Sequence, residues 1–154
     1  MKRSHTGFTM IELIIAILIG SILTTIALSR ISDAQSRVSV RGAKSTYASV
    51  HYRARAHGIE MGENVMLHVE SGGDSVWIEH DGAVLEKVRL GNEQNVDMRI
   101  TPSGAPTDFT LCFSPRGYTD VDCNSTNSIL RVEFWQGADS TSLLVLPMGQ
   151  LVTN

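Results

Sequence analysis

The feature that most constrains this chain is one long apolar run near the N-terminus. Residues 8–28 contain a single charged side chain, Glu12. A helix of that length spans about 32 Å, which is enough to cross the hydrocarbon core of a bilayer. Lys2 and Arg3 precede the run, so the positive-inside rule predicts a cytoplasmic N-terminus and an exported remainder. The sequence therefore predicts a single-pass inner-membrane protein with its head in the periplasm.

A cleaved secretory signal peptide is the alternative interpretation of this run. Ala27-Leu28-Ser29 is a small-x-small triplet that signal peptidase could cut. However, the run is longer than the roughly 7–15 apolar residues of an ordinary signal peptide. A carboxylate such as Glu12 also costs about 2.5–3.5 kcal/mol in a membrane helix. A helix that is retained can offset this cost when Glu12 later pairs with a cationic group of another protein, whereas a discarded signal peptide cannot. A retained helix is therefore favoured.

The residues that lead into the helix resemble a known processing signal. Gly7-Phe8-Thr9-Met10-Ile11-Glu12 resembles the class III signal of type IV pilins and type II secretion pseudopilins. The resemblance implies cleavage by a prepilin peptidase between Gly7 and Phe8, followed by N-methylation of Phe8. It also implies that Glu12, the fifth mature residue, pairs with the terminal amine of a neighbouring subunit. That role agrees with the need of a buried carboxylate for a hydrogen-bonded cation.

One difference from the family pattern bears on whether this chain is a major or a minor subunit of a filament. Major pilins of this family often have a helix-kinking proline where this chain has Ser29. The departure predicts a straighter stem and argues against a major subunit.

Beyond the apolar run, the pattern predicts that the helix continues to about His57. Apolar residues recur mostly every three or four positions, which places them on one stripe of a helix: Ile31, Ala34, Val38, Ala43, Tyr47, Val50 and Ala54. Six bases lie elsewhere in this segment, most simply as a solvated face, and Gly58 is the expected helix stop. The expected divisions are a leader (1–7), a membrane-spanning helix (8–28), an amphipathic stem (29–58) and a head (59–154).

The head changes to a strand pattern. Short β-prone segments separated by Gly, Asn, Asp and Pro predict an antiparallel region: residues 64–70, 75–79, 84–90, 96–101, 109–113, 129–135 and 143–146. The first two segments flank Ser71-Gly72-Gly73-Asp74, which predicts a hairpin. The fold class expected is α+β, a long N-terminal helix packed on an antiparallel β-sheet head.

Two further segments resemble a subgroup of the family. Phe113-Ser114-Pro115-Arg116-Gly117 and Pro147-Met148-Gly149 resemble the GspH/FimT group of minor pilins and pseudopilins. The first segment is also a good tight turn, in which proline presets φ and glycine supplies a positive φ. Both interpretations stay open at this point, and Arg116 is expected to order the loop rather than to do chemistry.

Cys112 and Cys123 are the two cysteines, and both lie in the exported head. An even count in an oxidising compartment predicts a disulfide, although a free thiol remains open if Cys112 points inward from a strand. Their spacing suits a zinc site poorly. The intervening Asp120-Val121-Asp122-Cys123-Asn124 begins like a calcium loop, but Ser125 and Arg131 stand where such a loop needs Gly and Glu. No metal or other cofactor is therefore expected.

The sequence argues against an enzyme. It contains no zinc-protease motif, no serine-hydrolase motif, no phosphate-binding loop and no dinucleotide-binding motif. Its five histidines do not cluster in the sequence. The head carries five bases against 14 acids, and the last six residues have no Lys or Arg. Because binding to phosphates depends on Lys and Arg, nucleic acid is not an expected partner.

Three functional hypotheses follow from these patterns. The leading one is a minor pseudopilin that joins a type II secretion pseudopilus through its helix and helps to initiate or cap it. Its partners would be other pilin subunits and the prepilin peptidase, with the inner membrane as its site before assembly. The second is a minor pilin of a type IV pilus used for DNA uptake, which the acidic head disfavours. The third is an anchored or secreted domain unrelated to filaments.

Overall fold

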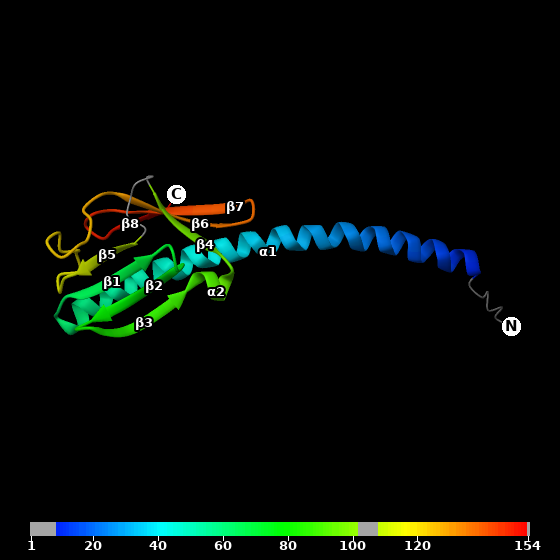
Figure 1. The fold of residues 1–154 in the computed structure, drawn as a ribbon. Coiled ribbons are helices and arrows are strands. Elements are labelled where there is room, and N and C mark those ends of the chain that lie inside the picture. Colours follow the sequence, from blue (N-terminus) through cyan, green and yellow to red (C-terminus); the bar gives the residue numbers. More distant parts are fainter. Residues whose placement is uncertain (1–8, 102–107, 154) are drawn as a thin grey trace, which may run out of the picture. The chain divides into compact units, whose positions relative to one another are not determined.

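The computed structural model describes residues 9–101 and 108–153 and separates into two compact units, Met1–Gln35 and Ser36–Asn154. Helix α1 (Met10–Met61) contributes to both units. The strands are β1 (Val65–Glu70), β2 (Ser75–His80), β3 (Ala83–Arg89), β4 (Asp97–Thr101), β5 (Asp108–Phe113), β6 (Leu130–Gln136), β7 (Asp139–Val145) and β8 (Leu151–Thr153), and helix α2 (Leu90–Gln94) lies between β3 and β4. The predicted α+β class is confirmed (Figure 1).

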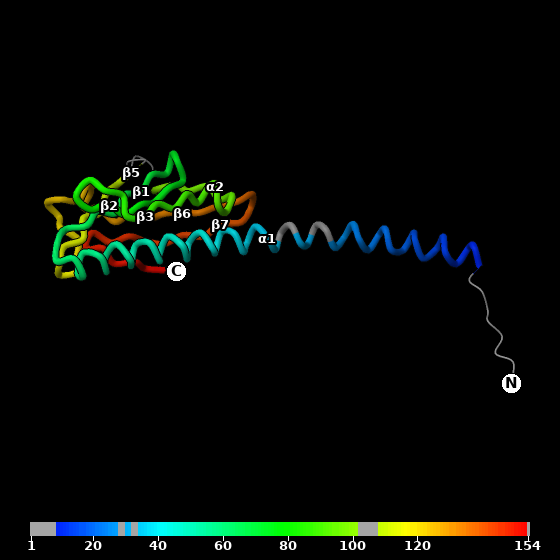
Figure 2. Tube along the Cα trace, turned by 90° about the horizontal axis from the view of Figure 1, so that it is seen from below, coloured from blue at the N-terminus to red at the C-terminus, as the bar shows by residue number. Residues whose placement is uncertain are grey.

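The second unit is built from two four-stranded antiparallel sheets and the C-terminal part of α1. One sheet has the order β3-β2-β1-β5, and the other has the order β4-β6-β7-β8. The alternate residues that point inward from both sheets join one apolar core with α1. Figures 1 and 2 show this part of α1 running along the sheets.

The buried face of α1 differs in part from the predicted stripe. Ala43, Tyr47, Val50 and Ala54 are fully buried as expected, but Val38 is 71% exposed. Val40 is buried in its place. Counting back from Ala43 gives the reason: Val40 lies three residues earlier and shares its face, whereas a residue five positions away turns to another side.

The predicted end of the helix at Gly58 is wrong, because α1 continues to Met61. Gly62, with φ of +71°, takes the left-handed conformation after the last turn, and its N–H donates to the Gly58 carbonyl at 3.2 Å. Gly58 has a different use. A Cβ at that position would lie 3.0 Å from the Phe113 carbonyl oxygen, so glycine allows the helix to approach the end of β5.

Two elements of the head, α2 and β8, were not predicted, and β7 begins earlier than predicted. Leu90 was expected to end a strand, but it begins α2 and is fully buried. The strand expected at 143–146 already begins at Asp139, where polar residues pair with the end of β6. The short edge strand β8 pairs with β7 and was missed because three residues carry too little pattern.

Candidate functional site

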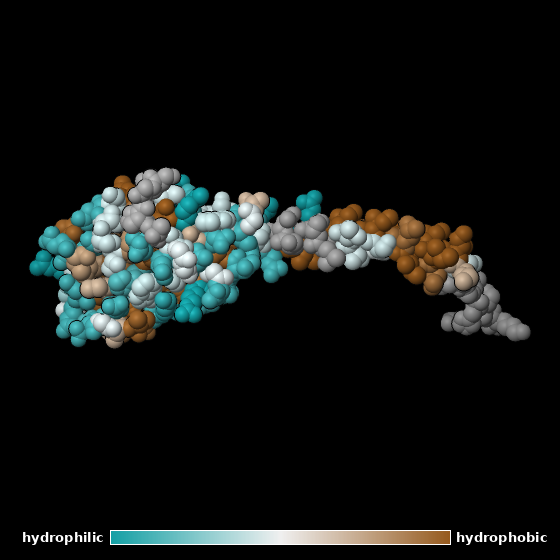
Figure 3. Space-filling view, in the orientation of Figure 1, coloured by the Kyte–Doolittle hydropathy of each residue, from teal (hydrophilic) through white to brown (hydrophobic). Residues whose placement is uncertain are grey.

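The first unit presents an apolar helix surface that nothing in the described structure covers. The segment Met10–Ala27 has a mean hydropathy of 2.3, and none of it is buried. Figure 3 shows apolar residues gathered on this part of α1, whereas the second unit is mostly polar on the side shown. An apolar surface of this extent requires lipid or neighbouring helices around it.

The start of α1 is capped by Thr9. The Glu12 N–H lies 3.4 Å from the Thr9 hydroxyl and 3.1 Å from its carbonyl, and the Leu13 N–H donates to the same carbonyl at 3.3 Å. Thr9-Met10-Ile11-Glu12 fits the capping-box pattern, a Thr followed three residues later by Glu. Sequence reasoning treated this stretch only as a processing signal, although the capping pattern was visible in it.

Glu12 lies in the first turn of α1 and is exposed. A carboxylate at this end of a helix interacts favourably with the helix dipole. Its position also leaves it available to a group from outside the chain. Gly7 and Phe8, the predicted cleavage and methylation residues, lie outside the described residues.

Three hydroxyl side chains in the apolar segment bond to the backbone of their own helix. Ser21 donates to the Leu18 carbonyl at 2.8 Å, Thr24 to the Gly20 carbonyl at 2.8 Å, and Thr25 to the Ser21 carbonyl at 3.0 Å. Hydroxyl groups in hydrocarbon must find such partners, because no water is present there. These residues therefore fit a membrane-spanning helix.

Two of the stem bases are paired with acids of the strands. The Arg37 Nε lies 3.2 Å from the Asp139 Oδ1. The Asp139 Oδ2 accepts a hydrogen bond from the Ser36 hydroxyl. The Arg53 guanidinium donates to both carboxylate oxygens of Glu86 on β3, from Nε at 2.8 Å and from Nη2 at 2.5 Å. The basic residues of α1 are thus not only a solvated face, since two of them tie the helix to β3 and to the start of β7.

His51 connects the stem helix to the C-terminal turn. It is fully buried, and its Nε2–H donates to the Gly149 carbonyl at 2.9 Å while its ring meets Phe113 edge-on. Burial lowers the pKa of His51 to about 4, an effect that the Gly149 bond opposes and the charge of Arg55 reinforces. His51 is therefore neutral at ordinary pH. Its place on the buried stripe, four residues after Tyr47, was the signal that could have identified it.

The two segments that resemble the GspH/FimT group meet beside His51. Gly149 packs so closely on Phe113 and Thr119 that a Cβ would lie 2.6 Å from the Thr119 Cγ2. The Thr119 hydroxyl donates to the Pro147 carbonyl. Gly117, with φ of +78°, completes the Pro115–Gly117 turn, as the tight-turn interpretation predicted. Both segments thus form one packed junction at the end of α1.

Cys112 and Cys123 form a disulfide, with Cα atoms 5.6 Å apart. Cys112 is fully buried on β5, so the inward-facing position that left the free thiol open is compatible with the bridge. The bridge closes the acidic turn around Asp120, whose N–H donates to the Cys112 carbonyl at 2.7 Å. Within the described residues no cluster of three or more His, Cys, Asp or Glu could hold a metal ion.

Comparison with known proteins gives one match for the N-terminal residues and a separate match for the fold. Residues 2–28 match the prokaryotic N-terminal methylation motif. The sequence has no match among curated proteins. The fold is similar to that of the type IV minor pilin FimU of Pseudomonas aeruginosa in two crystal forms. In one, the TM-score is 0.55 at 12% identity over 77% of this chain and 90% of the other, and in the second it is 0.53 at 13% identity over 74% and 91%.

These findings agree with the geometry of the chain. At such low identity the likeness to FimU concerns the fold alone, whereas the methylation motif concerns the processed N-terminus. One apolar N-terminal helix with this motif fits a membrane-anchored pilin, and pilins are structural subunits rather than enzymes. The motif and the pilin-like fold together support membership of this chain in the type IV pilin and pseudopilin superfamily.

Proposed function

We propose that this protein is a minor filament subunit, which enters a periplasmic pseudopilus or pilus through its N-terminal helix. In this proposal residues 1–7 are a leader removed between Gly7 and Phe8, and Phe8 becomes the N-methylated terminus. Residues 8–28 cross the inner membrane before assembly and line the filament core afterwards. Residues 29–58 form the stem, and residues 59–154 form a periplasmic head.

The observation that carries the proposal is the position of Glu12. An exposed carboxylate sits in the first turn of an otherwise apolar, unburied helix, within the matched methylation motif. Such a group is costly in hydrocarbon unless a cation pairs with it. The freed amine of a neighbouring subunit supplies that cation, so insertion into a filament compensates the cost.

Among filament machines, we place a type II secretion pseudopilus first, with a role in initiating or capping it. The junction of residues 113–117 with 147–149 is compatible with the GspH/FimT group. A type IV pilus subunit is the second candidate, because the fold is similar to that of a type IV minor pilin. A DNA-uptake role is disfavoured by the 14 acids of the head and by the tail that lacks Lys and Arg.

The proposal is tested by replacing Glu12 with alanine in cells that assemble filaments. Glu12→Ala is expected to insert and to be processed normally, because the change makes insertion easier. It is expected to be depleted from sheared or crosslinked filament fractions. Thr24→Ala is the matched control, since the Thr24 hydroxyl donates to the Gly20 carbonyl of its own helix, and this variant is expected to incorporate normally. Normal incorporation of Glu12→Ala would contradict the assembly role.

A further inference from the structure

The end of α1 and the two segments packed against it carry a group of side chains that we call the junction patch. It combines four apolar or aromatic residues with two arginines: Tyr52, Arg55, Ile59, Arg116, Tyr118 and Met148. The four apolar or aromatic side chains are each between 52% and 59% exposed. Apolar side chains that gather in one exposed place mark an interaction site.

The turn at residues 115–117 lies against one side of α1. On the helix, Tyr52, Arg55 and Ile59 recur every three or four residues and so share that side. A Cβ on Gly117 would lie 2.9 Å from the Ile59 Cδ1 and 3.2 Å from the Arg55 Nε. The turn and this side of the helix therefore form one continuous surface.

The C-terminal turn joins the same surface through two hydrogen bonds. The residue after Tyr118 donates its N–H to the Met148 carbonyl at 3.5 Å. The His51 Nε2–H donates to the Gly149 carbonyl at 2.9 Å, and the centre of the His51 ring lies 6.0 Å from that of Tyr52. These contacts hold the patch in place before it binds anything. A rigid surface loses little conformational entropy upon binding.

The two arginines of the patch lack an acidic partner. Neither Arg55 nor Arg116 makes an ion pair with any residue that the structure describes. The acids closest to them in sequence, Glu60 and Asp120, contact other groups of the chain. Two unpaired guanidinium groups therefore accompany the exposed apolar side chains. A carboxylate is the group that a guanidinium binds best.

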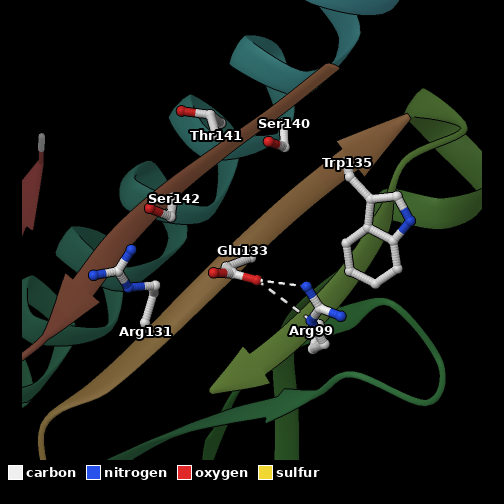
Figure 4. Close-up of a pocket in the computed structure, with 7 residues that line it drawn as sticks. All are labelled: Arg99, Arg131, Glu133, Trp135, Ser140, Thr141 and Ser142. Atoms are coloured by element: carbon white, nitrogen blue, oxygen red, sulfur yellow. Dashed lines mark hydrogen bonds and ion pairs between the residues drawn. The ribbon is translucent and has the colours of Figure 1, made fainter. Parts of the chain in front are cut away.

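The polar hollow on the outer face of the β4-β6-β7-β8 sheet, about 400 Å³ in volume, is less suited to a protein partner. Most of its lining consists of charged and hydroxyl side chains, and Arg99 is already held by Glu133 at 2.8 Å (Figure 4). The aromatic residue of the lining, Trp135, has the Arg99 guanidinium 5.1 Å from the centre of its ring. The junction patch instead combines Tyr, Met and Arg, which are the residue types enriched at protein interfaces.

We propose that the junction patch binds a different subunit of the filament, one that presents apolar side chains beside an Asp or a Glu. Arg116, the more exposed of the two arginines, would pair with that carboxylate. The tyrosines, Ile59 and Met148 would pack on the apolar side chains. A symmetric contact between two copies of this chain is disfavoured, because it would bring the arginines of both copies together. The inference rests on the proposed function, in which a minor subunit has other subunits as its neighbours.

Site-specific photocrosslinking of the full-length chain, in cells that assemble filaments, tests this contact. The probe p-benzoylphenylalanine replaces Tyr118, and adducts are identified by mass spectrometry of the crosslinked peptides. The same probe at Leu18, which is 57% exposed on the apolar part of α1, is the positive control for contact with other subunits. We expect the probe at Tyr118 to capture a second protein that carries its own N-terminal methylation motif. The captured peptide should contain an Asp or a Glu beside apolar residues.

Variants of the chain with the probe at Tyr118 test which side chains make the contact. We expect Tyr52→Ala and Arg116→Glu each to lower the adduct yield at least about fivefold. Arg89→Glu is the matched control, because Arg89 is exposed and precedes α2, which Figures 1 and 2 show at the opposite end of the second unit from the end of α1. It is expected to stay within about twofold of the unsubstituted chain. Replacing the captured acid of the partner by Lys should restore most of the yield of the Arg116→Glu chain.

Several outcomes would overturn the inference. They are the absence of an adduct at Tyr118 when the probe at Leu18 gives one, an adduct with a second copy of this chain or with a protein that lacks the methylation motif, and an Arg116→Glu effect no larger than that of Arg89→Glu. An adduct at Leu18 with another subunit would leave the proposed function standing in each of these cases. Absence of both adducts would contradict the proposed function together with the inference. Each variant is also checked for unchanged urea unfolding in detergent, and the partner's Lys variant separates lost pairing from lost folding.

Discussion

Gly149 lies at a position in the head where the neighbouring side chains leave no room for a Cβ. Its φ is +75°, and a Cβ would lie 2.6 Å from the Thr119 Cγ2 and 2.9 Å from the Phe113 Cε1. Its carbonyl also accepts the hydrogen bond from His51. Gly149→Ala therefore imposes a disfavoured backbone conformation and crowds the junction between α1, β5 and the C-terminal turn.

The magnitude follows from these two effects. A left-handed conformation costs a residue with a Cβ about 1–2 kcal/mol. Overpacking a filled site costs about 1–3 kcal/mol more. Gly149→Ala should then lower the free energy of unfolding by about 2–5 kcal/mol. Gly137→Ala is the matched control, because Gly137 has φ of +60° but open space at its Cβ position, so only the backbone cost of about 1–2 kcal/mol applies.

Urea unfolding of the full-length protein in detergent, followed by the fluorescence of Trp77 and Trp135, measures both losses. Both tryptophans lie on strands of the head, so the signal reports on the second unit. The expected result is a larger loss for Gly149→Ala than for Gly137→Ala. Equal losses would refute the reasoning, since they would mean that the close packing of Gly149 has no energetic consequence.

Three further predictions concern stability and processing. Because burial lowers the pKa of His51 to about 4 from 6.5, the unfolded chain binds that proton at higher pH than the folded head does. The free energy of unfolding should thus fall by up to about 3 kcal/mol between pH 6.5 and pH 4, and His51→Gln should remove this part of the dependence in urea titrations. Replacing Cys112 and Cys123 by serine should lower the free energy of unfolding by about 2–3 kcal/mol, measured against wild type under oxidising conditions, and an unchanged value would argue against a stabilising bridge. Gly7→Trp should leave the leader attached, which immunoblots of membrane fractions would detect as a larger chain, and normal cleavage would contradict the assigned junction.

The sequence predicted the fold where a strong pattern exists. The apolar run, the strand-rich head and the hairpin at residues 71–74 each have a periodicity or turn signature that acts locally. The cysteine pair was predictable because only two cysteines exist and the head was expected to be exported. These features depend little on the rest of the chain.

The features that could not be predicted from the sequence depend on contacts between residues far apart in the chain. Gly58 resembles a helix stop, yet it serves the contact of α1 with Phe113, which is 55 residues away in the chain. The polar start of β7 has no strand pattern of its own, because it takes its conformation from pairing with β6. The polar hollow on the outer face of the β4-β6-β7-β8 sheet, whose lining includes Arg99, Arg131 and Glu133, likewise forms only because the register aligns three strands.

The central claim is that this chain is processed as a prepilin and retains its helix. Intact mass spectrometry of the protein extracted from membranes tests it most directly. The expected mass is that of residues 8–154 with one methyl group on the amine of Phe8 and one disulfide between Cys112 and Cys123. A chain that begins at Arg30, after a signal-peptidase cut, or one that keeps Met1 would contradict the account.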